Sequence, residues 1–283
     1  VDFSKSSVFN KKFKYTPHNK GGEYRKWYGN QNYFLKYSKS DISEMSKNVG
    51  FRYDGKEYYF TPHIGWSKIT SSKSSFRYYN NSFTFDSAGL GLFCKNQLSI
   101  VELQILLAFL NSKIVEVLLA ILNPTLNVTP AIVKKLPYPQ NDNKTLTLAQ
   151  SNIAISREDW DAFETSWDFK RHPLIRKVET IEEAFLAWEK ECADRFRQLK
   201  ANEEELNRIF IEIYGLQDEL TPDVEDKDVT VRKADLVRDI KSFISYAVGC
   251  MFGRYSLDAD GLAFAGGEWD ESKYKPSPAD KDA

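Results

Sequence analysis

The sequence changes character at Ser99, and this change limits the folds that the chain can adopt. Before it, aromatic and β-branched residues form short runs, as at 58–61, 76–79 and 83–85, which is typical of strands. After it, apolar residues recur at helical spacing. We therefore predict an α+β protein, in which a strand-rich part is followed by a helical C-terminal region.

The first helix is predicted at about 99–122. Ser99 is suited to be its N-cap, with Glu102 placed three residues on to complete a capping box. Asn111 and Ser112 are expected to break or bend the helix, and Asn123-Pro124 to end it.

The second half of the chain carries two further helical patterns. Thr180 and Glu183 repeat the capping-box spacing ahead of a long helix or helical hairpin, which Gly215 is expected to end. A final helix is predicted at about 232–252. The chain is thus divided into a mixed domain at 1–140, a connector with short elements at 141–178, a helical domain at 179–271 and a mobile tail at 272–283.

Charge separates the two halves of the chain. Residues 1–150 hold 20 Lys and Arg against 10 Asp and Glu, whereas residues 151–283 hold 19 against 30, so the overall net charge of -1 hides a basic half and an acidic half. A basic half is suited to a polyanion such as nucleic acid. The acidic half is not suited to lie along phosphates.

Other bulk features narrow the class of protein. The three cysteines are far apart and contain no CxxC pair, which argues against a disulfide framework or a cysteine-based zinc site. Charged residues interrupt the most apolar stretch, 100–122, so we expect no membrane span. No signal peptide opens the chain, and the expected location is the cytoplasm.

No catalytic motif is recognised. His18, His63 and His172 lie outside any nucleophile or helical metal motif and are interpreted as loop or core residues. The acidic run at 222–227 only superficially resembles a nuclease site, because its acids lie within three residues of one another. It is expected to be a solvated loop.

The segment 86–91 holds two glycines, Gly89 and Gly91, as does the loop that binds S-adenosylmethionine in methyltransferases. A bulge or bend beside a strand is the preferred interpretation. The turn that holds the target amine, Asn-Pro-Pro followed by an aromatic residue, is absent, since the nearest segment is Asn123-Pro124-Thr125-Leu126. We therefore expect no methyl transfer by this chain alone.

Two clusters in the basic half combine cations, amides and aromatic residues, at 24–32 and 66–78. Such residues can neutralise phosphates, read base edges and stack on unpaired bases. The alternative is a tyrosine-rich core surrounded by solvated lysines. The candidate contacts to phosphates or guanine edges are Arg25, Lys26, Lys68, Lys73 and Arg77, and the candidates for readout are Tyr28, Trp66, Ser71 and Ser72.

Several blocks resemble the BREX phage-defence adenine methyltransferases. They are 22–30, 65–71, 107–113, 123–127, 134–139, 199–210 and 244–255, and the last two are the most specific. The resemblance implies a cytoplasmic enzyme that transfers a methyl group from S-adenosylmethionine to adenine N6 at a non-palindromic DNA site. It also implies a catalytic domain that lies N-terminal to a target-recognition region.

This chain is then expected to be the C-terminal, specificity-bearing part, similar to the specificity regions of type I and type IIG restriction systems. Its expected partners are double-stranded DNA, the N-terminal methyltransferase domain and other defence-system proteins, and S-adenosylmethionine belongs to the missing domain. The alternative is a protein-interaction scaffold that docks defence components or a DNA-mimic phage inhibitor.

Overall fold

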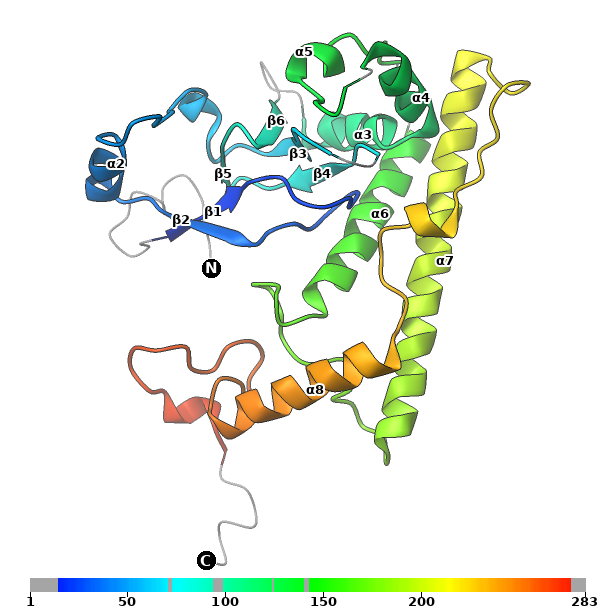
Figure 1. Cartoon of the computed structure of the whole chain (residues 1–283). Coiled ribbons are helices and arrows are strands. Elements are labelled where there is room, and N and C mark those ends of the chain that lie inside the picture. The colour runs from blue at the N-terminus through cyan, green and yellow to red at the C-terminus, as the bar shows by residue number, and fades with distance from the viewer. Residues whose placement is uncertain (1–14, 71–72, 94–98, 124, 140–142, 276–283) are drawn as a thin grey trace, which may run out of the picture. The chain divides into compact units, whose positions relative to one another are not determined.

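The computed structural model describes residues 15–70, 73–93, 99–123, 125–139 and 143–275 (Figure 1). The chain forms two compact units, each built from two stretches. Unit 1 holds Val1–Arg157 and Gln198–Thr230, and unit 2 holds Glu158–Arg197 and Val231–Ala283. The linear domain limits expected from the sequence stay a prediction, and Ser71, Ser72 and most of the tail lie outside the described residues.

Unit 1 contains two small sheets of three strands each. In the first, β1 (Tyr15–Asn19) lies between β2 (Tyr33–Lys36), which is antiparallel to it, and β5 (Thr84–Phe85), which is parallel. In the second, β3 (His63–Ser67) lies between β4 (Phe76–Tyr79) and β6 (Gly89–Phe93), both antiparallel to it. Helix α2 (Lys39–Met45) and the 3-10 turn η1 (Lys56–Tyr58) connect the sheets.

The strand predictions were partly right. The runs at 76–79 and 83–85 coincide with β4 and β5. The prediction of a strand at 58–61 was wrong. The chain leaves the 3-10 turn η1 at Tyr58, and the φ of Phe60 is 60°, which is outside the range of a β-strand. Residues 80–82 between the runs at 76–79 and 83–85 are suited to a hairpin turn, but they do not form a hairpin: the Ser82 N–H donates to Asn80 Oδ1 at 2.9 Å in a turn, while β4 and β5 belong to different sheets.

Aromatic rings fill the space around the sheets. Tyr37, Tyr59 and Phe60 form a buried cluster, so part of the tyrosine content of this half serves the core. His63 stacks on Tyr79 with ring centroids 5.0 Å apart and is fully buried, as expected for a core histidine. Burial lowers the pKa of His63 to about 4, so this histidine is neutral at physiological pH.

Two helices follow the sheets, and both their start and their break were predicted correctly. Helix α3 (Ile100–Leu110) begins with the expected capping box of Ser99 and Glu102. Helix α4 (Lys113–Leu122) follows at a bend of 67°, after Asn111 and Ser112. Among the described residues no single helix is long and apolar enough to cross a membrane, and the α3–α4 pair passes that test only when its two bent halves are taken together. The one-turn helix α5 (Pro130–Val133) comes next.

Helix α6 (Asn143–Asp161) was not predicted from the sequence, where only short elements were expected in this region. Its buried positions recur at helical spacing but are mostly polar: Thr145, Ala149, Asn152, Ser156 and Asp159. A polar buried stripe gives no hydrophobic periodicity, so the amphipathic pattern that marks most helices is absent here.

The long pattern after Thr180 is one helix, α7 (Ile181–Tyr214), rather than a hairpin. The Thr180 hydroxyl accepts a hydrogen bond from the Glu183 N–H at 3.1 Å, as a helix N-cap does. Gly215, with a φ of 66°, ends the helix as predicted, and the Leu216 N–H reaches back to the Ile211 carbonyl at 3.0 Å in a Schellman motif.

Helix α8 (Leu236–Met251) confirms the last predicted helix and is capped by Asp235. Its residues take part in the core of unit 2, where the Trp188 indole N–H donates to the buried Asp239 carboxylate at 2.9 Å. Short 3-10 turns, η2 (Asp226–Asp228) and η3 (Glu271–Lys273), complete the described elements.

Candidate functional site

The two sequence clusters singled out above lie side by side in unit 1. The segment 24–28 runs along β4, where the Trp27 N–H donates to the Phe76 carbonyl at 2.9 Å and the Tyr78 N–H donates to the Trp27 carbonyl at 2.8 Å. These bonds form a parallel bridge between Trp27 and Arg77. The structure therefore brings together residues that are about 50 positions apart in the sequence.

Arg77 lies at the centre of this arrangement and is fully buried, with 0% of its surface exposed. Its guanidinium donates to the Arg25 carbonyl at 3.0 Å and to the Ser75 hydroxyl at 3.2 Å. It also donates to the Tyr79 hydroxyl at 3.3 Å and to the Ser67 hydroxyl at 3.4 Å. In this conformation the guanidinium joins segments of the fold to one another.

Arg25 is also buried, at 8% exposure. Its guanidinium donates to three backbone carbonyls: Tyr28 at 2.7 Å, Ser156 in α6 at 3.0 Å, and Thr230 at 3.2 Å. Because these acceptors come from three distant parts of the sequence, Arg25 holds the 24–28 segment against the helical part of unit 1.

Glu203 of α7 binds the same segment through both oxygens of its carboxylate. The Lys26 ammonium lies 2.5 Å from Oε2, and the Trp27 indole N–H donates to Oε1 at 2.7 Å. All three side chains are buried. Lys26 is therefore neutralised inside the fold, and no sequence pattern links it to Glu203.

The two aromatic candidates are also enclosed. The indole of Trp66, buried in β3, donates to the Val128 carbonyl at 2.8 Å. Tyr28 is buried except for its edge, and the Arg157 guanidinium lies 5.6 Å from its ring centroid. Whether either ring meets DNA stays a prediction, as it does for Arg25, Lys26 and Arg77.

Lys68 and Lys73 are the partly exposed members of the predicted set, while Ser71 and Ser72 lie outside the described residues. Lys73 lies between two carboxylates, 2.9 Å from Glu116 and 2.7 Å from Asp228. Burial opposes its charge, but the hydrogen bonds to Asp228 and Glu116 prevail and raise the pKa of Lys73. Lys68 bonds through its backbone to Ala88 and Val128.

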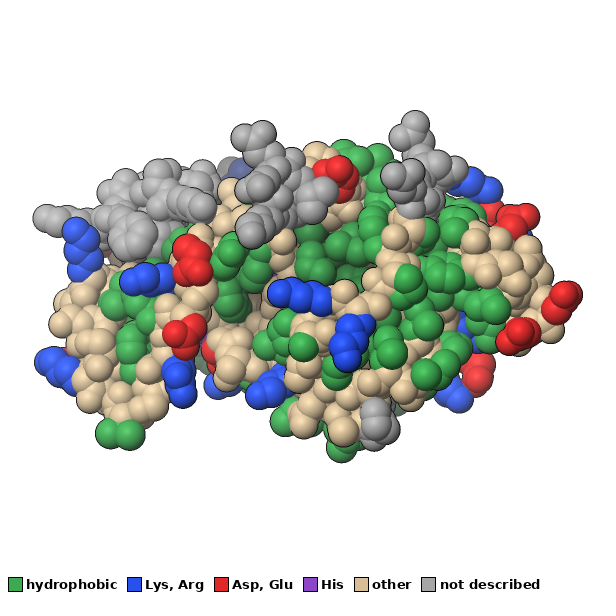
Figure 2. Space-filling model, turned by 90° about the horizontal axis from the view of Figure 1, so that it is seen from above, with side chains coloured by type: hydrophobic (Ala, Val, Ile, Leu, Met, Phe, Trp, Pro, Cys, Tyr) green, Lys and Arg blue, Asp and Glu red, His purple; other side chains and the backbone are tan. Residues whose placement is uncertain are grey.

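The face of the molecule that Figure 2 shows is not one continuous basic field. In the face that Figure 2 shows, lysine, arginine and acidic side chains are interspersed among hydrophobic ones. The basic excess of the first half includes buried cations, such as Arg25 and Arg77, whose guanidinium groups are used inside the fold in this conformation.

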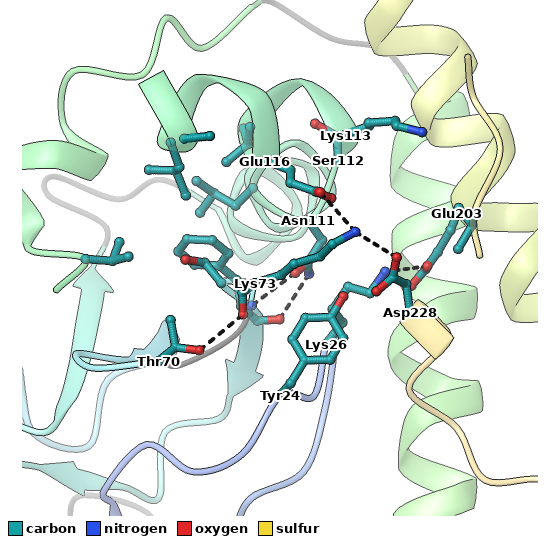
Figure 3. Close-up of a pocket in the computed structure, with 18 of the residues that line it drawn as sticks. Tyr24, Lys26, Thr70, Lys73, Asn111, Ser112, Lys113, Glu116, Glu203 and Asp228 are labelled. Atoms are coloured by element: carbon teal, nitrogen blue, oxygen red, sulfur yellow. Dashed lines mark hydrogen bonds and ion pairs between the residues drawn. The ribbon is translucent and has the colours of Figure 1, made fainter. Parts of the chain in front are cut away.

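Lys73 projects into a pocket of about 320 Å³ beside α4 (Figure 3). Its charged lining consists of Lys26, Lys73, Lys113, Glu116, Glu203, Asp223, Glu225 and Asp228. Carboxylates outnumber lysines, so the pocket itself is not suited to a phosphate. Burial is the main cause that raises the pKa of the Tyr24 hydroxyl well above its usual range, and the nearby carboxylates raise it further.

The glycine segment does not fit a methyl-donor loop. Gly89 and Gly91 lie within β6, not in the bulge or bend that was expected. A Cβ at Gly89 would lie 2.4 Å from the Asn19 carbonyl oxygen, and one at Gly91 would lie 2.6 Å from the Phe93 ring. Both glycines are explained by close packing of strands, and the space beside them is filled by protein.

The acidic run at 222–227 is a loop around η2, as expected. Two of its carboxylates form ion pairs with lysines: Asp226 with Lys200 of α7 at 2.8 Å, and Glu225 with Lys227 at 2.6 Å. Among the described residues no group of three or more His, Cys, Asp or Glu side chains could hold a metal ion.

No family model matches this chain. It is 47% identical over 280 residues to the adenine-specific methyltransferase PglX of Lacticaseibacillus casei (strain Zhang), a match that covers 94% of the chain and 23% of that protein. It is 33% identical over 296 residues to the adenine-specific methyltransferase BrxX of Escherichia coli O9:H4 (strain HS), which covers 95% of the chain and 24% of that protein. The chain thus spans about a quarter of the length of these relatives. By sequence, the chain is thus related to one segment of the adenine-specific methyltransferases PglX and BrxX.

Proposed function

We propose that this chain is the DNA-recognition region of an adenine-specific DNA methyltransferase in a phage-defence system. The observation that carries the proposal is the 47% identity to a methyltransferase of which the chain covers only 23%. A recognition region supplies the sequence preference, and a separate domain supplies the chemistry.

The packing of the β6 glycines and the charge of the first half support this assignment of recognition and chemistry to separate regions. The glycines of β6 are packed against Asn19 and Phe93 within a strand, which supports their interpretation as structural glycines. We propose that the methyl donor binds a methyltransferase domain outside this chain. The first half of the chain has the basic excess that favours contact with phosphates.

The predicted contact residues divide into two groups by burial. Arg25, Lys26 and Arg77 are buried and join segments of unit 1 to one another in this conformation. Lys68 and Lys73 are partly exposed. A DNA phosphate at Lys73 must compete with Glu116 and Asp228 for the ammonium. No ion pair to Lys68 is found among the described residues, so Lys68 is the better candidate for a phosphate contact.

An exchange of this region between two full-length relatives tests the proposal. The segment equivalent to residues 1–283 is replaced in a methyltransferase of known motif, and methylated adenines are mapped across a genome. We expect the methylated motif to follow the exchanged segment. A motif that stays with the original methyltransferase domain, in an active chimera, contradicts the proposal.

A second candidate function is a protein-interaction scaffold. The observation that favours it is a line of exposed apolar side chains on and just after α8: Val237, Ile244, Val248, Met251 and Phe252. These residues recur at helical spacing and present an apolar stripe to solvent. A titration with duplex DNA at low salt separates the two functions, since a scaffold alone does not bind DNA.

A further inference from the structure

We propose that the exposed edge of β2 is a contact surface for duplex DNA, an inference that rests on the proposed function and adds residues to it. The surface, named here the β2 edge, consists of Tyr15, Lys20, Tyr33, Phe34 and Lys36. None of these residues was singled out from the sequence. They are brought together by the pairing of β1 with β2.

The β2 edge is open to solvent. β2 is the outer strand of its sheet among the described residues, with β1 on its inner side. Tyr33 and Phe34 are 49% and 44% exposed, although large aromatic side chains in a strand normally pack against the protein. Two adjacent exposed rings on an edge strand mark a surface that meets another molecule.

Each face of the edge joins an aromatic ring to a lysine. Adjacent residues of a strand point to opposite faces, so Tyr33 and Phe34 lie on different sides. The Lys20 ammonium lies 5.6 Å from the centroid of the Tyr33 ring. On the other side Lys36 is two residues from Phe34 and directly opposite Tyr15 in the register.

The charge of the edge fits a polyanion. Lys20 and Lys36 are exposed, and no ion pair to either is found among the described residues. The carboxylate of Asp86, which follows β5, is paired with His18 at 3.4 Å and accepts hydrogen bonds from the N–H groups of Ala88 and Gly89. The two ammonium groups are thus available to phosphates.

The spacing of the two lysines favours a duplex. His18 is opposite Tyr33, and Lys20 lies two residues beyond His18, so a continuation of this register places Lys20 about five residues along the sheet from Lys36. At about 3.3 Å per residue this is roughly 16 Å. A major groove about 12 Å wide accepts a two-stranded ribbon. Lysines at the two ends of the edge can then meet phosphates on both sides of the groove, with the rings between them.

The test measures salt-dependent binding of the 283-residue chain to random-sequence duplex DNA. The charge variant is Lys20→Ala with Lys36→Ala, and its matched control is Lys177→Ala with Lys241→Ala, two exposed lysines of unit 2. Both double variants change the net charge equally. We expect only the first to make the slope of log K against log salt shallower by about 2, since two phosphate contacts are lost.

A second set of variants tests the aromatic rings. It consists of Tyr33→Ala and Phe34→Ala, and the control is Phe252→Ala, which replaces an exposed phenylalanine of unit 2. Loss of a ring contact weakens binding without a change of salt slope, because no ion is released. Thermal melts of every variant show that the fold is retained.

The outcomes are distinct. If the unchanged chain binds no duplex at low salt, the proposed function fails. If it binds but both double variants behave alike, DNA recognition stands and the β2 edge is not the contact surface. If single-stranded RNA or polyglutamate binds with the same dependence on Lys20 and Lys36, the edge is a general polyanion surface and its assignment to duplex DNA is overturned.

Discussion

The side-chain amide of Asn111 pairs with the backbone of Phe76 through two hydrogen bonds, one in each direction. The Phe76 N–H donates to Asn111 Oδ1 at 3.0 Å, and Asn111 Nδ2 donates to the Phe76 carbonyl at 3.0 Å. The Asn111 amide thus satisfies both backbone groups of Phe76, as the backbone of a neighbouring strand would. The residue that breaks the helix between α3 and α4 also fixes the helices to the sheet.

Replacing Asn111 is expected to destabilise unit 1. Asn111→Ala removes both bonds and leaves two backbone groups of Phe76 without this partner, at a cost of about 1–3 kcal/mol. Chemical denaturation measures the change. Asn123→Ala is the control, because among the described residues its side chain is bonded to the exposed Thr125, two residues on, and a cost as large as that of Asn111→Ala contradicts the prediction.

Glu203→Gln is expected to cost about 3 kcal/mol in the free energy of unfolding, since it leaves the buried Lys26 ammonium without a counter-charge. The Trp27 bond survives, because the amide oxygen still accepts it. The double variant with Lys26→Met is expected to regain much of the loss. A surface pair, Lys144 with Glu205, is the control and is expected to change stability by less than about 1 kcal/mol when Lys144 is replaced by Ala.

Arg77→Ala distinguishes a structural from a reading role of this guanidinium. We expect a fall in melting temperature, because the hydrogen bonds of Arg77 to Arg25, Ser75 and Tyr79 are lost inside the fold. Methylation-site sequencing of the full-length enzyme is the second measurement. A variant of unchanged stability that methylates a relaxed motif would show instead that Arg77 reads a base.

Stability is expected to fall as the pH decreases from about 6.5 to about 4. Burial lowers the pKa of both His63 and His172 to about 4, so in this range the unfolded chain binds protons that the folded chain does not. The loss is about 2 kcal/mol per histidine at pH 5. Denaturation of His63→Phe at pH 7.5 and pH 5 checks this: its pH dependence is expected to be smaller than that of the unchanged chain, and an equal dependence refutes the assignment.

The helices show what sequence reasoning can achieve. Capping residues and apolar spacing are local signals, so Ser99, Asn111 and Gly215 marked helix limits correctly. Helix α6 was missed because its buried side chains, such as Asn152 and Ser156, are polar and find their environment only in the folded chain.

The candidate site was harder to predict for the same reason. An arginine in a basic, aromatic stretch is usually exposed, and nothing near Arg25 or Arg77 in the sequence reveals that carbonyls far along the chain satisfy them. The exposed β2 edge was missed because exposure depends on which strand lies outermost, and strand order is not a local property.

The two-stretch composition of unit 1 has a consequence for evolution. Natural recombination that exchanges only the first 140 residues separates Lys26 and Trp27 from Glu203, whose carboxylate binds both side chains. Such hybrids inherit a mismatched interior unless both parents share these residues. Viable hybrids are therefore expected to inherit both stretches of unit 1 together, or to differ only in surface residues.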